Sequence, residues 1–130
     1  MATVTTKLTV SSSDLTSQIL SLSLSKAITA SHTTGLARTK VGQTAVHSNA
    51  ALLYTADDYA ATAYVYIKNI DTTATNYVYV YDDTTSGDPV ILKLAGGEFA
   101  FMPTNADKTL KAYGTNATSV VEWMVFGVDQ

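Results

Sequence analysis

The chain has 130 residues and a formal net charge of −3; only 15% of its residues are charged, whereas 46% are hydrophobic. This length suits a single domain with its own core, and the absence of cysteine excludes both a disulfide framework and a thiolate zinc site. The eight Lys and Arg residues are scattered singly, which argues against a nucleic-acid groove, and no long uncharged apolar run could span a bilayer.

The first predicted element covers residues 2–10, where apolar and hydroxyl side chains alternate as in a half-buried strand. Val4, Leu8 and Val10 lie on its apolar side. The SSS run at 11–13 separates this strand from the rest, so residues 1–13 could form an extended arm or add a strand to a neighbouring chain. If the segment pairs within its own subunit instead, those three side chains should belong to that subunit's core.

Further strands follow at intervals typical of an all-β sandwich or barrel. Leu and Ser alternate over residues 20–25, which predicts a second strand to about residue 29, and a weaker, edge-like strand follows the turn at 31–35. Later strands are expected at 50–54, 63–70, 76–82, 90–94, 98–102, 109–113 and 119–128, with Pro103 closing the fifth of these. The predicted fold is therefore one domain over residues 1–130, an antiparallel β-sandwich or jelly-roll-like barrel of about 8 to 10 short strands.

Two of these predicted strands, at 63–70 and 76–82, carry tyrosine on the face that should be exposed to solvent. If residues 63–70 and 76–82 pair as a hairpin, Val and Ile fill the inner face and five tyrosines form an outer patch: Tyr64, Tyr66, Tyr77, Tyr79 and Tyr81. Each tyrosine buries on the order of 150 to 250 Å² when covered. The area of this patch would then match or exceed the apolar area that a monomer normally exposes in one patch, so we expect another chain to cover part of it.

The last strand repeats this two-sided pattern. Met124 and Phe126 point to one side, whereas Val121, Trp123 and Val125 point to the other. Association is the simplest way to cover both faces, and we expect Trp123 to join the tyrosines at an interface. The alternative is that one such strand lies inside a closed barrel beneath the loop at 47–59.

No motif carries catalytic chemistry, and we expect no enzyme, cofactor, metal or small-molecule substrate. SLSK at 23–26 matches the S-x-x-K pattern, but a strand points its Ser and Lys to opposite faces. His32 and His47 lack the spacing of zinc ligands. The three aspartates at 82, 83 and 88 lack the register of a calcium loop, and Glu122 on the last strand should find a Lys partner or lie near the strand end.

The second half of the chain resembles small virion proteins of tailed bacteriophages. The resemblance rests on VYIKN at 65–69, on the L-x-G-G-E-F-x-x-x-P pattern from Leu94 to Pro103, and on the final TLKAYGTNATSVVEWMVFGV, and it covers roughly residues 61–130. It implies a structural virion protein, most often a capsid decoration or cement protein and less often a tail or fibre component. The alternative from another class is a glycan-binding β-sandwich that uses exposed aromatic rings.

The resemblance also implies partners and a location. We expect a homo-oligomer, most often a trimer because shell proteins occupy local threefold axes, bound to the major capsid protein or another virion protein. The segment MATVTTKLTV lacks the apolar centre of a secretion signal, so we expect synthesis in the host cytoplasm and a final location in the virion. Neither nucleic acid nor a membrane is an expected partner.

Overall fold

A computed structural model describes residues 1–15, 17–43 and 50–130 and shows an all-β protein with antiparallel sheets, none of them closed into a barrel. The predicted fold class is therefore confirmed as a β-sandwich. Over the described residues no helix is long and apolar enough to cross a membrane. The strands are β1 (Ala2–Ser12), β2 (Leu20–Ala30), β3 (His32–Thr33), β4 (Ala37–Lys40), β5 (Ala51–Tyr54), β6 (Tyr59–Asn69), β7 (Val78–Asp82), β8 (Val90–Leu94), β9 (Phe99–Asn105), β10 (Leu110–Gly114) and β11 (Val120–Asp129).

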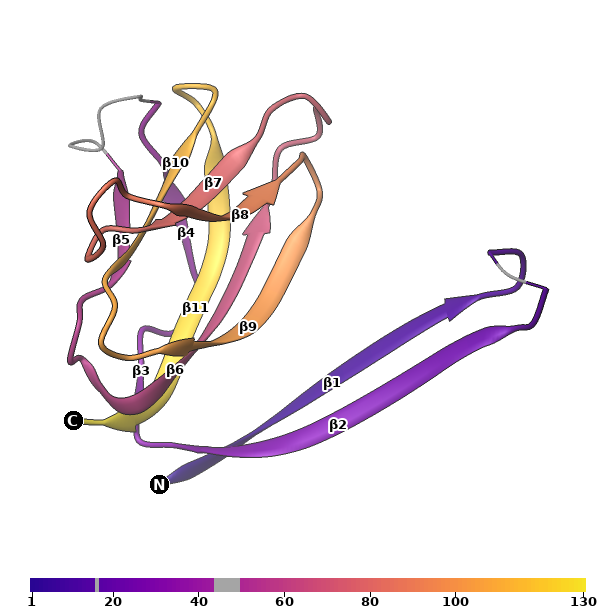
Figure 1. The fold of residues 1–130 in the computed structure, drawn as a ribbon, viewed down its shortest axis with the longest axis horizontal. Helices are drawn as coiled ribbons and strands as arrows, with labels where there is room; N and C mark the ends of the chain where they lie inside the picture. The colour runs from indigo at the N-terminus through magenta and orange to yellow at the C-terminus, as the bar shows by residue number, and fades with distance from the viewer. Residues whose placement is uncertain (16, 44–49) are drawn as a thin grey trace.

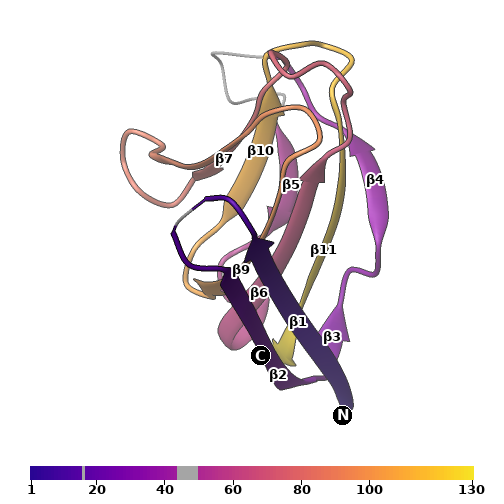
Figure 2. The same ribbon diagram turned by 90° about the vertical axis from the view of Figure 1, so that its right-hand side faces the viewer.

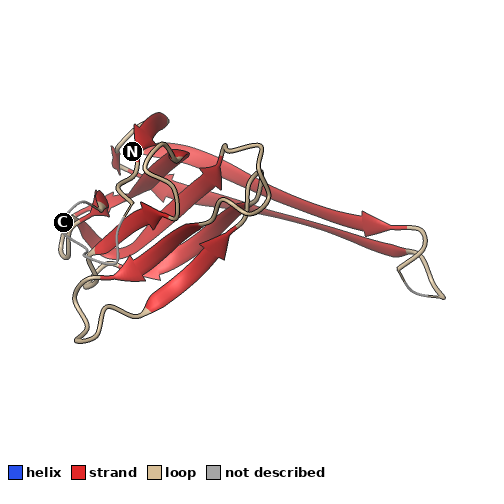
Figure 3. Ribbon diagram, turned by 90° about the horizontal axis from the view of Figure 1, so that it is seen from above, coloured by secondary structure: helices blue, strands red, loops and turns tan. Residues whose placement is uncertain are grey.

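Two sheets face each other to form the body of the molecule (Figures 1 and 2). One has the strand order β5-β10-β7-β8; the other has the order β3-β11-β6-β9, with β4 also paired to β11. The remaining strands, β1 and β2, form a separate two-stranded sheet that projects from the body (Figure 3). The molecule is thus a sandwich with one long hairpin attached.

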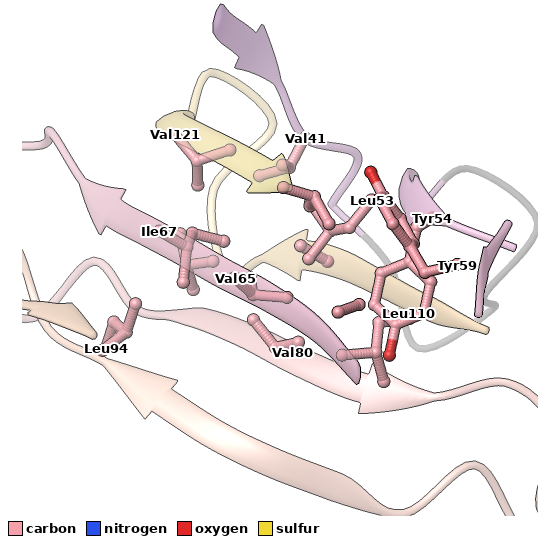
Figure 4. Close-up of a cluster of buried hydrophobic side chains, with 14 of the residues drawn as sticks. Val41, Leu53, Tyr54, Tyr59, Val65, Ile67, Val80, Leu94, Leu110 and Val121 are labelled. Atoms are coloured by element: carbon pink, nitrogen blue, oxygen red, sulfur yellow. The ribbon is translucent and has the colours of Figure 1, made fainter. Parts of the chain in front are cut away.

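The core lies between the two large sheets and follows from the alternation of their strands. Val65 and Ile67 of β6 face Val80 of β7 across this space, and all three side chains are fully buried (Figure 4). Val121 and Val125 of β11 join them from the same sheet as β6. The aliphatic faces predicted for these strands therefore do point inward.

The two tyrosine strands do not pair with each other, so the predicted hairpin is wrong. β6 pairs with β11 and β9, whereas β7 pairs with β10 and β8 in the opposite sheet. The short link between them crosses from one sheet to the other, because each strand has one aliphatic face and the two faces must meet in the core. Asn69 secures this crossing: its buried side-chain nitrogen donates to the carbonyls of Asn76 at 2.7 Å and Leu94 at 3.1 Å.

Pro103 does not close its strand either. β9 continues to Asn105, and Pro103 lies opposite Tyr64 of β6. Among the described strands β9 pairs with β6 alone, so it is an edge strand, and the N–H groups on its other side have no strand to bind. Proline, which has no N–H to donate, is tolerated on an edge strand of this kind.

Candidate functional interface: the arm and the cleft beneath it

We define the arm as the hairpin of β1 and β2. The two strands pair along their whole length, with Leu8 opposite Leu24 and Val10 opposite Leu22. The SSS run therefore belongs to the hairpin end rather than to a break between a lone N-terminal strand and the body. The predicted arm of residues 1–13 is one strand of a two-stranded arm that extends to Ala30.

The register gives the arm two different faces. Residues opposite each other in an antiparallel pair point to the same side, so the even-numbered residues of both strands form one face. That face is largely aliphatic, whereas the other carries mostly Ser and Thr, as in the pairs Thr9–Ser23 and Ser11–Ser21. The arm is an amphipathic ribbon.

The base of the aliphatic face packs on the body. Ile28 and Ala30 are buried against Phe126 of β11, and Val4 and Met124 pack against this cluster. This contact covers part of the second apolar face of β11, for which the sequence predicts cover by another chain or by a barrel interior. The arm of the same chain therefore covers part of that face.

Beyond the base, the aliphatic face of the arm lies open. Leu8 is 47% exposed and Leu24 is 55% exposed, and Val10 and Leu22 are each 41% exposed. Of the three residues predicted to be either core or interface, only Val4 approaches the core, while Leu8 and Val10 remain accessible. The outer half of the arm thus presents an aliphatic strip that is only about half covered by the described residues of its own subunit.

The opposite wall of the cleft is aromatic. It is the outer face of the β11-β6-β9 sheet, where Phe101, Tyr66 and Met124 form one row across three strands. In the next row Tyr64 stacks on Phe126 with 5.5 Å between ring centroids, and Phe101 lies 6.1 Å from Phe126. Arm and wall enclose a cleft of about 580 Å³ lined by side chains of both. Phe99, at its rim, is 66% exposed.

A polar group sits beside this aromatic wall. Glu122 accepts a hydrogen bond from the Tyr66 hydroxyl at 2.9 Å and pairs with Arg38, whose Nη2 lies 3.1 Å from the carboxylate. The Tyr66 hydrogen bond and then the Arg38 guanidinium lower the pKa of Glu122, while burial raises the pKa of Tyr66. Glu122 therefore stays charged and forms an ion pair with Arg38, while Lys68, directly opposite it on β6, also lowers its pKa. These contacts fix the Tyr66 ring in the cleft wall.

The other tyrosines lie on the opposite side of the sandwich. Tyr79 stacks on Tyr113 of β10 at 5.2 Å, and Tyr77 lies 6.4 Å from Tyr79 with the Lys93 ammonium 4.0 Å from its ring. The predicted five-tyrosine patch is therefore wrong: Tyr66 lines the cleft and Tyr64 lies in the next row of the same sheet face, whereas Tyr77 and Tyr79 belong to a separate surface on the other sheet.

Two members of the predicted interface are covered within the subunit, Tyr81 beside Tyr113 on the outer face of its sheet and Trp123 on the core side. Tyr81 is fully buried, and this burial, followed by the nearby charges of Asp83 and Asp88, raises its pKa to about 12. Trp123 packs against the core, and its ring nitrogen donates to the Thr39 hydroxyl at 2.9 Å. Neither side chain lines the cleft, because the alternation of β11 places Trp123 on the same side as Val121 and Val125.

The sequence does not single out several residues that line the cleft. Leu24, Phe99 and Phe101 line it, yet none of them belongs to the predicted interface. The signal is present, since residues 20–25 alternate as regularly as residues 2–10. Two such strands joined by one short polar link are typical of a hairpin.

The candidate catalytic and metal residues are not brought together. Ser23 and Lys26 lie on a strand at odd separation and so point to opposite faces. His47 lies outside the described residues, and His32 lies 3.9 Å from Asp129. Among the described residues no three His, Cys, Asp or Glu side chains cluster closely enough to hold a metal ion.

Comparison of the chain with protein-family models, with curated proteins and with solved structures finds no match.

Proposed function

We propose that this chain is a non-enzymatic structural protein of a tailed-bacteriophage virion, a capsid decoration protein that binds and stabilises the phage head. One observation carries the proposal: the arm projects from a sandwich with few charged residues, and the aliphatic face of the arm is accessible over its outer half. Such a face gains free energy when another protein surface covers it. A decoration protein needs this kind of attachment to a repeated surface and needs no catalytic group.

The residues that carry the resemblance form one connected unit in the fold, which supports the proposal. The Gly96-Gly97 turn joins β8 to β9, and Gly97 adopts a φ of +84°, a conformation that favours glycine. Its N–H donates to the carbonyl of Asn69 at 2.9 Å, and the N–H of Asn69 donates to the carbonyl of Glu98 at 2.9 Å. The end of VYIKN and the GGE turn are thus held together by reciprocal hydrogen bonds.

The proposal is tested on virus particles purified from the organism that carries this gene. Mass spectrometry should detect the chain in intact particles, and cryo-electron microscopy should place it on the outer surface of the head in symmetric copies. Density on the tail alone would favour the tail or fibre component. Particles that contain their other structural proteins but lack this chain would overturn the proposal.

A glycan-binding module is the second candidate, and the row of Tyr77, Tyr79 and Tyr113 favours it. Their rings lie on the outer side of the β10-β7 pair, and stacked rings at such spacing are suited to sugar rings. Titration of the protein with a panel of bacterial surface glycans, followed by tyrosine fluorescence, tests this candidate. A signal that Tyr79→Ala removes would support it.

A further inference from the structure

The exposed strip of the arm consists of two directly opposed pairs, Leu8–Leu24 and Val10–Leu22. We propose that this strip is a self-association surface, and that the same strip of a second copy of this chain covers it. The two arms pack face to face around a two-fold axis. This inference does not depend on the virion function, because it rests on the geometry of the arm and of the cleft wall that faces it.

The first argument is that the strip of one copy is complementary in shape and polarity to the strip of a second copy. A two-stranded ribbon with one aliphatic face is complementary to another ribbon of the same width and pattern, as the two sheets of a sandwich are. Stacked sheets lie roughly 10 Å apart with interdigitated side chains. The aliphatic pairs would then meet between the arms, while Thr9 and Ser23 on the other face would point away from that contact.

The second argument is the available area. A fully buried aliphatic side chain removes roughly 60 to 120 Å² from water, from its transfer free energy at about 25 cal/mol per Å². With 41–55% of each side chain exposed, the four aliphatic residues offer roughly 110 to 220 Å² in one arm. Phe99 and Phe101, 66% and 42% exposed on the facing wall, add roughly 160 to 270 Å² if the second arm enters the cleft.

The two copies together would bury roughly 550 to 1,000 Å² of apolar area. Because about 60% of an interface is apolar, the whole contact amounts to roughly 900 to 1,600 Å². Crystal contacts mostly bury less than about 800 Å², whereas specific interfaces begin near 1,200 Å². We therefore expect a dimer that forms in a concentration-dependent manner.

Sedimentation of the purified chain over a range of concentrations tests the inference. The double variant Leu8→Thr/Leu24→Thr keeps good strand formers at both positions but removes the aliphatic pair, and it should weaken the dimer at least about tenfold. The matched control Thr9→Ser/Ser23→Thr changes the neighbouring pair on the other face and should leave the dimer unchanged. A monomer at all concentrations, or equal association of both variants, would overturn the inference.

Cysteine crosslinking gives a second readout that does not depend on the stability of the double variant. The chain has no cysteine, so a single introduced thiol can be joined only to another molecule. With a short thiol-to-thiol crosslinker, Leu24→Cys or Val10→Cys should yield covalent dimers, whereas Ser23→Cys should not. Dimers from Ser23→Cys alone would refute the face-to-face arrangement, and a trimeric mass in sedimentation would replace it with contacts between arm and body.

Discussion

Replacing Asp82 by Asn should destabilise the fold in a manner that depends on pH. Asp82 ends β7, and its carboxylate accepts hydrogen bonds from the Thr84 backbone N–H at 2.8 Å and from the Thr85 hydroxyl at 2.6 Å. The Lys108 ammonium lies 3.4 Å away. Burial by itself raises the pKa of this group, but the hydrogen bonds from Thr85 and Thr84, together with Lys108, outweigh it and lower the pKa to about 2.

The size of the effect follows from this pKa. A fall from 3.8 to about 2 corresponds to about 2.4 kcal/mol in favour of the folded state when Asp82 is charged. Because the folded-state pKa is the lower one, the contribution is complete above about pH 5 and is lost as the pH falls toward 2. Asp82→Asn should therefore cost about 2 kcal/mol at pH 7, equivalent to about 7 °C in melting temperature for a chain of this length.

Thermal and denaturant unfolding of both proteins between pH 7 and pH 2 measures this difference. Asp83→Asn is the matched control: Asp83 pairs with Lys111 at 2.7 Å, but both side chains are about 30% exposed, so its loss should cost less than about 1 kcal/mol. The reasoning would be refuted if the Asp82 variant were as stable as the unmodified protein at pH 7. It would also be refuted if the deficit were the same at pH 2.

Three further predictions concern the crossing, the backbone contacts and the arm. Asn69→Ala removes the buried side-chain donor that binds the carbonyls of Asn76 and Leu94, and it should cost about 3 kcal/mol in denaturant unfolding. Gly127→Ala would place a Cβ 2.7 Å from the carbonyl oxygen of Thr62, so the melting temperature should fall by an amount equivalent to about 1 to 3 kcal/mol, and an unchanged value would contradict this close approach. Deleting residues 1–13 leaves β2 without its partner and should give an aggregating product, whereas deleting residues 1–30 removes the arm as a unit and should leave a sandwich with its β circular dichroism and cooperative unfolding.

The positions of the strands could be predicted from the sequence, but several of their partners could not. Alternation of Val and Tyr over residues 63–70 and 76–82 marks which side chains point together, and those faces are correct. It does not say whether two neighbouring strands lie side by side or face each other across the core. Asn69 favours the second arrangement, because its side chain can bind the chain that turns away toward the other sheet.

The tyrosine rows have two explanations that the sequence could not separate. On β6, Tyr66 lines the cleft beneath the arm and Tyr64 packs against the cluster at the base of the arm, and that cover comes from residues more than 30 positions earlier in the chain. On β7, Tyr79 stacks on Tyr113 of β10, which lies beside it only because the two strands pair. In both cases the neighbour of a tyrosine is fixed by sheet order, and local periodicity does not contain that order.

The arm raises a question of stability that bears on its function. An isolated two-stranded hairpin is at best marginally stable in water, because it buries too little to offset the entropy of ordering its backbone. Only the base of this arm packs on the body, through the cluster around Ile28 and Phe126. Its outer half, where Leu8 and Leu24 are exposed, should therefore exchange amide hydrogens quickly in a dilute monomer and slowly once a second surface covers it. Order in the outer arm and assembly are then two measures of the same event, and hydrogen exchange at rising protein concentration should show them change together.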